Sequence, residues 1–289
     1  MNTESPFESP QTALWRGPAG QAWVAAQAVL DSMFQAFAER LVQAALAAAA
    51  RRVLDIGCGT GSSTLALAQA LGPQSQCLGV DVSDPMLALA QARQAELGLQ
   101  AASFIRADAQ RHRFEPDHFD LLTSRFGVMF FDDPVQAFQN LRKAAKAGTG
   151  RLHLQAWRSM AENPFMSTAE RAAARLLPQL PARQPGAPGQ FAFADGGWVR
   201  AMLAQAGWVE VQVKPLDVDC EFAERDLTLY LSRLGPLGLW LQQQPDTLQR
   251  ETIIRHVRGA FQPFVHGDTV RFKAACWQIS ARAPTAQEQ

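Results

Sequence analysis

Short apolar runs and longer segments with helical spacing alternate between residues 52 and 157. The runs 76–81 and 151–157 are rich in apolar residues and predict strands buried in a sheet. Between such runs, apolar residues recur three or four positions apart, as in Val135, Phe138 and Leu141, which predicts helices packed by one face. This alternation predicts an α/β fold with a mostly parallel sheet and helices on both of its faces.

Turn and cap residues mark where these elements begin and end. Gly72-Pro73 follows a helix predicted over 62–71, and Asp84-Pro85 provides a cap and a first-turn proline for a helix that stops at Gly98. Further strands are predicted over 102–106 and 117–124, and Asp133-Pro134 begins another helix. Ligands of such sheets bind at the carboxyl ends of the strands, so functional residues are expected there.

The regions outside this core are less regular. Leu30, Phe34, Phe37 and Leu41 are spaced four, three and four residues apart and predict one N-terminal helix. Residues 158–194 hold five prolines and predict a cover on the ligand edge of the sheet. The predicted division is a helical lid segment at 1–50, the core at 51–157, a cap insertion at 158–194, a continuation of the core at 195–223, a helical insertion at 224–267, and the last core strand with a tail at 268–289.

Composition excludes several classes of protein. The 289 residues include 27 Lys and Arg against 27 Asp and Glu, so no basic face is expected and a nucleic-acid partner is not predicted. The four cysteines and five histidines lack metal-ligand spacing, which predicts free thiols and no metal site. Without a signal peptide or a spanning segment in the sequence, we expect a cytoplasmic protein with no membrane partner.

The stretch 53–63 carries the strongest functional signal. A predicted strand ends here, and Gly57, Gly59 and Gly61 then lead into a helix near Ser62. Alternate glycines between a strand and a helix indicate that the backbone approaches a ligand. A dinucleotide-binding loop would place its third glycine one residue later, at the position of Ser62.

Two carboxylates indicate the kind of ligand. Asp55 precedes the first glycine by two residues, where it would repel a phosphate and attract an ammonium group. Asp81 ends the next predicted strand, where a carboxylate can accept both hydroxyls of a ribose. A nucleoside with an amine at its other end describes S-adenosylmethionine. Ser62 and Asp55 oppose the alternative of an NAD-dependent oxidoreductase.

Four stretches in this order resemble the class I S-adenosylmethionine-dependent methyltransferases: 53–63, 78–83, 105–109 and 119–132. The resemblance covers residues 50–156 well and the remainder loosely. It implies a Rossmann-like sheet of seven strands, mostly parallel with an antiparallel last strand, together with helices on both faces and a helical cap.

The resemblance also implies roles for individual residues. Asp108 and Ala109 would bind the adenine edge, and Arg125 would lie at the methionine end unless it forms a surface ion pair. Val82 and Met86 would pack on the adenine face or belong to the ordinary core, and Trp15 and Trp23 would either touch the cofactor or anchor the lid to the sheet. The candidate cofactor-binding residues are Trp23, Asp55, Gly57, Cys58, Gly59, Gly61, Asp81, Val82, Met86, Asp108, Ala109 and Arg125.

No catalytic residue is assigned with comparable support. His153 lies in the middle of a predicted strand, where it is expected to be a hydrogen-bonded interior histidine, with a general base as the alternative. Because the cofactor already carries an excellent leaving group, proximity and orientation are expected to supply most of the catalysis.

The sequence thus predicts an S-adenosylmethionine-dependent methyltransferase that forms S-adenosylhomocysteine by in-line displacement. The rings of the cover suggest a small apolar or aromatic acceptor, or they bury the insertions on the sheet; they are Phe165, Phe191, Phe193, Trp198 and Trp240. The chain looks similar to the ubiquinone and menaquinone methyltransferases, while O-, N-, S- and C-methylation all stay open. A non-catalytic module that binds the same cofactor is the alternative from another class, and a homodimer is one option for the oligomeric state.

Overall fold

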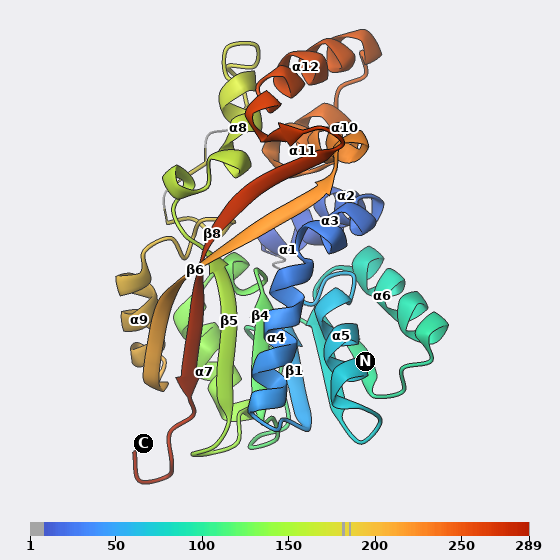
Figure 1. Ribbon diagram of the computed structural model, residues 1–289. Helices are drawn as coiled ribbons and strands as arrows, with labels where there is room; N and C mark the ends of the chain where they lie inside the picture. The colour runs from blue at the N-terminus through green and yellow to red at the C-terminus, as the bar shows by residue number, and fades with distance from the viewer. Residues whose placement is uncertain (1–8, 181–182, 185, 289) are drawn as a thin grey trace.

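A single twisted sheet forms the centre of the computed structural model, which describes residues 9–180, 183–184 and 186–288 (Figure 1). Its strands follow the order β3-β2-β1-β4-β5-β8-β6, and a short strand β7 pairs with β8 outside this path. The strands are β1 Arg52–Ile56, β2 Gln76–Asp81, β3 Ala102–Arg106, β4 Leu121–Arg125, β5 Arg151–Trp157, β6 Val209–Ala223, β7 Val265–His266 and β8 Thr269–Arg282.

Strand directions confirm the predicted fold class. Strands β1 to β5 pair in parallel, and β8 runs antiparallel to both β5 and β6. The last core strand is therefore antiparallel, as the resemblance implies. The short strand β7, which pairs Val265 with Val270 and His266 with Thr269, is an eighth strand that the sequence pattern does not predict.

Helices cover both faces of the sheet, with α4 and α5 in front and α7 behind in Figure 1. The helices are α1 Pro10–Arg16, α2 Pro18–Ala25, α3 Gln27–Met33, α4 Gln35–Ala47, α5 Ser62–Leu71, α6 Asp84–Leu97, α7 Pro134–Ala144, α8 Pro164–Ala173, α9 Gly196–Gln205, α10 Leu227–Arg233, α11 Gly235–Gln242 and α12 Thr247–Gly259. Short 3₁₀ turns are η1 Val128–Phe130, η2 Met160–Glu162, η3 Glu224–Asp226 and η4 Gln262–Phe264.

Local sequence signals explain most helix ends. The Asp133 side chain caps α7 by accepting from the Gln136 amide, and Pro134 occupies the first turn. Helix α7 then buries Ala137, Phe138, Leu141 and Ala144. Gly98, with φ of 64°, ends α6 in the left-handed conformation that glycine adopts without strain.

Two boundary predictions are wrong, and the predicted cap of α6 is shifted by one residue, because Ser83 and not Asp84 occupies the N-cap position. The single N-terminal helix expected over Leu30 to Leu41 is broken at Phe34, although the four predicted core residues are all buried. The fourth strand begins at Leu121 rather than residue 117, because Phe119 forms only an isolated bridge with Ala145. Parts of the predicted segments lie outside the described residues, namely 1–8 of the lid, 181–182 and 185 of the cap, and 289 of the tail.

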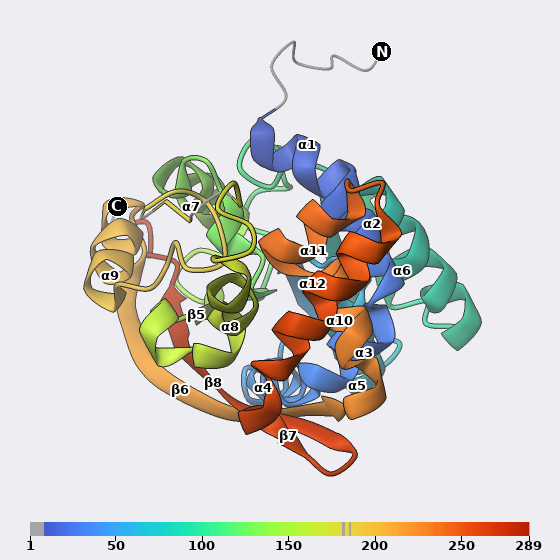
Figure 2. The ribbon, with the colours of Figure 1, turned by 90° about the horizontal axis from the view of Figure 1, so that it is seen from above.

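The predicted insertions lie over the carboxyl ends of the strands. Seen from above in Figure 2, helices α8, α10, α11 and α12 occupy this end of the molecule together with α1 and α2. Strands β6 and β8 continue past the end of β5, from the pair Asp217 and Ala275 to the pair Ala223 and Thr269, and carry α10 to α12 at their tip. A stack of Phe165 on Phe272, with centroids 3.9 Å apart, attaches α8 to this long hairpin.

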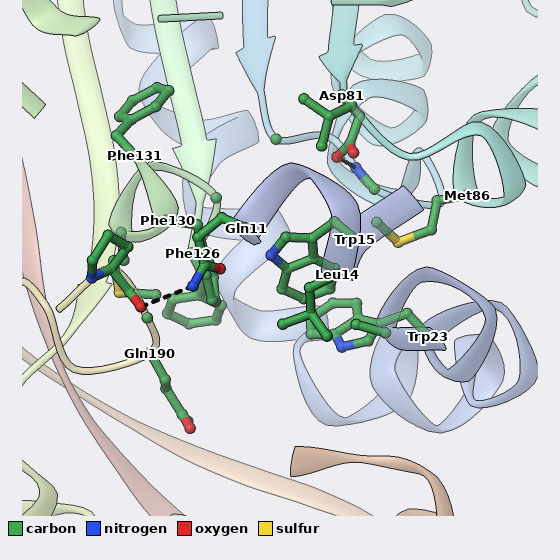
Figure 3. Close-up of a pocket in the computed structure, with 18 of the residues that line it drawn as sticks. Gln11, Leu14, Trp15, Trp23, Asp81, Met86, Phe126, Phe130, Phe131 and Gln190 are labelled. Atoms are coloured by element: carbon green, nitrogen blue, oxygen red, sulfur yellow. Dashed lines mark hydrogen bonds between the residues drawn. The ribbon is translucent and has the colours of Figure 1, made fainter. Parts of the chain in front are cut away.

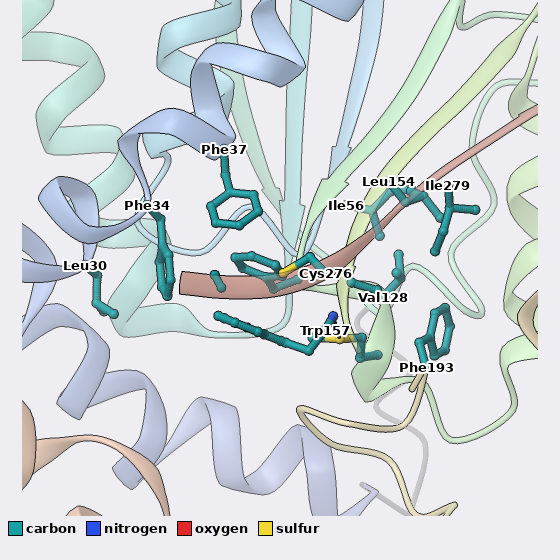
Figure 4. Packing of buried hydrophobic residues seen from close by; sticks show 14 of the residues in the cluster. Leu30, Phe34, Phe37, Ile56, Val128, Leu154, Trp157, Phe193, Cys276 and Ile279 are labelled. Atoms are coloured by element: carbon teal, nitrogen blue, oxygen red, sulfur yellow. Dashed lines mark hydrogen bonds between the residues drawn. The ribbon is translucent and has the colours of Figure 1, made fainter. Parts of the chain in front are cut away.

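An aromatic core lies between the sheet and the N-terminal helices (Figure 4). Phe126 stacks on Trp157 with centroids 4.7 Å apart, and Phe34 and Phe37 meet this pair edge-on. Phe165 and Phe193 of the cover are buried as well, so these two rings serve packing, whereas Trp198 is 43% exposed.

The structure also bears on three expectations from composition. The four cysteines, Cys58, Cys77, Cys220 and Cys276, are buried free thiols. Within the described ranges, three or more His, Cys, Asp or Glu side chains nowhere gather into a possible metal site. In the same ranges, every helix is too short or too polar to cross a bilayer.

Candidate functional site

A cavity of about 430 Å³ lies at the carboxyl ends of β1, β2 and β4, between the sheet and the cover (Figure 3). Its walls come from the loops after the strands, from α1 to α3, from residues of α8, α10 and α11, and from Arg183 and residues 188–190. This volume is in the range of small-molecule sites. The cavity therefore brings the predicted strand-end site and the predicted cover together.

The structure explains the presence of glycine differently at each of the three loop positions. A Cβ on Gly57 would lie 2.7 Å from the Cα of Gly127, and one on Gly61 would lie 2.9 Å from the Cβ of Ala90, so both are required by packing. Gly59, with φ of 56°, would meet only the Met86 sulfur at 3.7 Å. Gly57 and Gly59 line the cavity and Gly61 does not, so the predicted approach of a ligand to the backbone stays open at Gly57 and Gly59.

Asp81 ties the glycine loop to the end of β2. Its carboxylate accepts from the backbone amide of Gly59 at 2.8 Å and from that of Ser83 at 2.9 Å, and it lines the cavity. Burial raises the pKa of Asp81, while these backbone hydrogen bonds act in the opposite direction by stabilising the anion. The same carboxylate therefore orders the loop and faces the cavity.

Asp55 lies behind the loop instead of on the cavity wall. Its Oδ2 accepts from the hydroxyls of Ser63 and Thr64, both at 2.6 Å, while Oδ1 is buried without a partner among the described residues. Burial raises the pKa of this carboxyl. Asp55 therefore lies one layer away from the cavity wall, where it holds the start of α5, and its contact with a ligand amine stays a prediction.

Cys58 is the third predicted contact that does not line the cavity. Its buried sulfur lies on the β2 side, where it would be 2.9 Å from a Cβ added to Gly79. Burial, together with the charges of Asp81 and Asp55, raises the pKa of its thiol well above the ordinary value. Cys58 is therefore a neutral packing residue.

The predicted adenine-binding residues converge on one part of the cavity. Val82, Met86, Asp108 and Ala109 all contribute to its wall. Asp108 accepts from the amide of Gln110 at 2.9 Å and is half-buried, so part of its carboxylate stays accessible. Val82 and Met86 thus offer apolar surface next to the Asp108 carboxylate. A purine with an exocyclic amine needs both kinds of contact.

Both predicted tryptophans face the cavity (Figure 3). Trp15 meets Trp23 edge-on at 5.6 Å and Phe130 at 4.9 Å, so the rings also anchor the N-terminal helices. Gln11 of α1 donates to the carbonyl of Pro188 at 3.2 Å and joins the lid to the cap loop. The two expected roles of the tryptophans, contact with the cofactor and anchoring of the lid, are therefore compatible with each other.

Arg125 presents a half-buried cation to the cavity. Its guanidinium donates to the carbonyl of Phe34 at 3.3 Å and is not part of a direct ion pair within the described residues. Burial lowers its pKa, and the negative charges of Asp31 and Asp55 oppose this effect. Since a guanidinium has five N–H donors, this side chain has unused capacity to bind an anion.

Phe126, the next residue, also lines the cavity and stacks on Trp157. Its φ of 67° is unusual for a side chain of this size. Strained backbone of this kind occurs where surrounding structure fixes a functional loop.

His153 lies away from the cavity, as its predicted interior position implies. Its Nε2 is buried without a partner in the described part of the chain, so the expectation that it is hydrogen-bonded is wrong at this atom. The neighbouring Thr123, aligned with it on β4, has a buried hydroxyl in the same condition. Burial lowers the pKa of His153.

The N-terminal helices, the ends of the core strands and the cover all contribute cavity residues that the sequence does not identify as a site. They include Met33, Phe34, Met129, Trp157, Met166, Arg183, Tyr230, Arg233 and Leu239. Tyr230 packs on Phe165 and Phe222 and also lines the cavity. Its place there depends on the hairpin of β6 and β8, which no local pattern reveals.

Comparison with known proteins defines the family. A family model described as a methyltransferase domain matches residues 53–148. The chain is 30% identical over 177 residues to a demethylmenaquinone methyltransferase of Anoxybacillus flavithermus, across 57% of this chain and 72% of that protein. The chain belongs to the class I S-adenosylmethionine-dependent methyltransferases.

Solved structures place the fold of this methyltransferase among related ones. The [4+2]-cyclase SpnF matches with a TM-score of 0.57 and 18% identity, over 98% of this chain and 100% of that one. Phosphoethanolamine N-methyltransferase 2 of Haemonchus contortus, solved with S-adenosyl-L-methionine, matches with a TM-score of 0.57 and 17% identity, over 97% of this chain and 61% of that one. Because one neighbour is a cyclase, the chemistry of this methyltransferase has to be argued from its site.

Proposed function

We propose that the protein transfers the methyl group of S-adenosylmethionine to a small aromatic acceptor that carries hydroxyl groups, of the hydroquinone type. The observation that supports this best is the division of the cavity. Carboxylates, backbone groups and Arg125 lie at the strand ends, whereas thioethers and rings dominate the part below the cover. The first part suits a charged nucleoside and the second suits an apolar acceptor.

The residues at the strand ends fit the cofactor. Asp81 would accept the ribose hydroxyls, Asp108 and the Ala109 amide would bind the adenine edge, and Val82 and Met86 would cover its face. The open space next to Gly59 leaves room for a ligand against the backbone. Arg125 would use its remaining donors for the methionine carboxylate.

The acceptor class draws support from the lining and from the relative. The alignment with a demethylmenaquinone methyltransferase favours a quinol ring as acceptor. Trp157, Phe34, Met33 and Met129 line the cavity and offer flat or adaptable apolar surface to such a ring.

The mechanism requires little proton transfer from the protein. The cofactor, when bound, supplies a methyl group on a positively charged sulfur. Transfer of this methyl group turns the sulfur into a neutral thioether. Among the described cavity-lining residues there is no histidine to act as a base. An acceptor that is itself acidic would react as its anion, so the protein's task is to hold it in line with the methyl group and exclude water.

Binding and transfer measured together test this function. Calorimetry should detect binding of S-adenosylhomocysteine, and labelled S-adenosylmethionine should transfer its methyl group to 1,4-naphthohydroquinone in preference to a thiol or an amine of similar size. Binding without transfer to any hydroquinone, phenol, thiol or amine would support the non-catalytic module. Transfer to thiols or amines alone would contradict the acceptor class.

A further inference from the structure

The single tyrosine of the chain has an unusual position in the cover. Tyr230 lies in α10, and its ring packs among Phe165 at 5.4 Å, Phe222 at 5.7 Å and Phe261 at 6.4 Å. These rings belong to α8, to β6 of the long hairpin and to the residue before η4. Tyr230 is also one of the residues that line the cavity, and so is Met166, the partner of its hydroxyl.

The Tyr230 hydroxyl is poorly satisfied by the protein. Its one partner among the described residues is the sulfur of Met166, to which it donates at 3.7 Å. A thioether is a weak acceptor, whereas buried hydroxyls normally bond to oxygen or nitrogen. Met166 also lines the cavity, so a ligand oxygen entering there can replace the sulfur without disturbing another hydrogen bond.

Two charged groups of the cap act on this hydroxyl. Glu170 of α8 forms a two-point ion pair with Arg183, with contacts between 2.6 and 3.2 Å, and Arg183 itself lines the cavity. Burial raises the pKa of Tyr230 far above its ordinary value; the charge of Arg183 opposes this rise and that of Glu170 adds to it. The phenol therefore stays protonated and acts as a hydrogen-bond donor instead of a base.

We propose that Tyr230 donates a hydrogen bond to an oxygen atom of the acceptor and so selects acceptors that carry oxygen on an aromatic ring. This inference rests on the proposed function, since it assigns the part of the cavity below the cover to the acceptor. Tyr230 is in this sense a specificity-determining residue, because a ligand without an oxygen would leave the partly buried hydroxyl with its weak sulfur partner.

Two ligands of equal size test the proposal. With S-adenosylhomocysteine present, wild-type protein should bind 1-naphthol more tightly than 1-methylnaphthalene. Tyr230→Phe should weaken binding of 1-naphthol by roughly 3- to 10-fold and leave 1-methylnaphthalene unchanged. Met166→Leu, the matched control, removes the sulfur partner, keeps the tyrosine, and should preserve the preference.

The outcomes separate this inference from the proposed function. An equal loss for both ligands in Tyr230→Phe, an unchanged preference, or failure of wild-type protein to bind either ligand while it binds S-adenosylhomocysteine would overturn the role of Tyr230. Failure to bind S-adenosylhomocysteine would instead overturn the proposed function. Tyr230→Phe should retain its melting temperature, because it loses one weak hydrogen bond.

A second measurement needs no substitution. Protein labelled with ¹³C at the tyrosine Cζ gives one resonance, because Tyr230 is the sole tyrosine. The resonance should move further on addition of 1-naphthol than of 1-methylnaphthalene, as the hydroxyl exchanges sulfur for oxygen. Equal shifts would mean that only the ring senses the ligand and would contradict the proposal.

Discussion

The backbone amide of Gly59 donates to the Asp81 carboxylate at 2.8 Å and joins two loops that follow neighbouring strands. Asp81 lies at the cavity, so the residue proposed to bind the ribose also holds the loop proposed to face the cofactor. Loss of this carboxylate should thus reduce both binding and local order.

Replacement of Asp81 tests this double role. Asp81→Ala should weaken binding of S-adenosylhomocysteine by about 1–3 kcal/mol, because hydrogen bonds to a charged acceptor are lost. Calorimetry measures the change, and Asp84→Asn, which removes an exposed carboxylate three residues away, is the control. Unchanged affinity in Asp81→Ala would show that the residue is only structural.

Gly59 and Gly98 form a matched pair for testing ligand approach. Both have positive φ, of 56° and 64°, and neither has a protein atom within 3.4 Å of an added Cβ. Valine at either site should therefore cost similar stability, about 1–2 kcal/mol. Only Gly59→Val should abolish binding of S-adenosylhomocysteine, and equal binding by both variants would show that no ligand approaches this loop.

Arg125 is tested by comparing two ligands. Arg125→Lys should weaken S-adenosylhomocysteine binding by about 5- to 20-fold, since lysine cannot make the planar two-point contact with a carboxylate. Binding of methylthioadenosine, which lacks the amino acid group, should not change. If both ligands lose affinity equally, Arg125 supports the loop without binding the carboxylate.

The interior position of His153 is expected to make the stability of the protein depend on pH. Burial lowers the pKa of the folded-state imidazole below its ordinary value of 6.5, so the unfolded chain binds the proton more readily. This histidine therefore lowers the free energy of unfolding as pH falls below that value, by at most about 1.4 kcal/mol per pH unit. Above it the histidine is neutral in both states and adds no pH dependence.

Denaturant unfolding between about pH 7 and pH 5 measures this effect. His153→Leu should make the free energy of unfolding depend less on pH than in the wild type. His256→Leu, at an exposed position of α12, should leave the wild-type slope intact. An unchanged slope in His153→Leu would mean that the buried histidine does not resist protonation.

Sequence signals predicted the core well because they are local. Helix α5 and strand β2 have the expected bounds, and the expected cap and proline begin α7. The break at Phe34 was missed because its side chain keeps the apolar spacing of one continuous helix while the backbone turns.

The site was only partly predictable because several contacts depend on distant neighbours. Gly57 and Gly61 are explained by Gly127 and Ala90, which no spacing rule relates to them. The Asp55 carboxylate bonds to hydroxyls of α5, so its charge is used inside the fold. Tyr230 lies in α10, far along the chain from the strands whose ends form the cavity.

The length of β6 and β8 has an evolutionary consequence. The hairpin supports α10 to α12 at its tip, while the strand-end loops stay in the body of the sheet. Insertions or exchanges at the tip can remodel the part of the cavity proposed for the methyl acceptor and leave the loops proposed to face the nucleoside unchanged. Relatives with a common donor site can in this way diverge in what they modify.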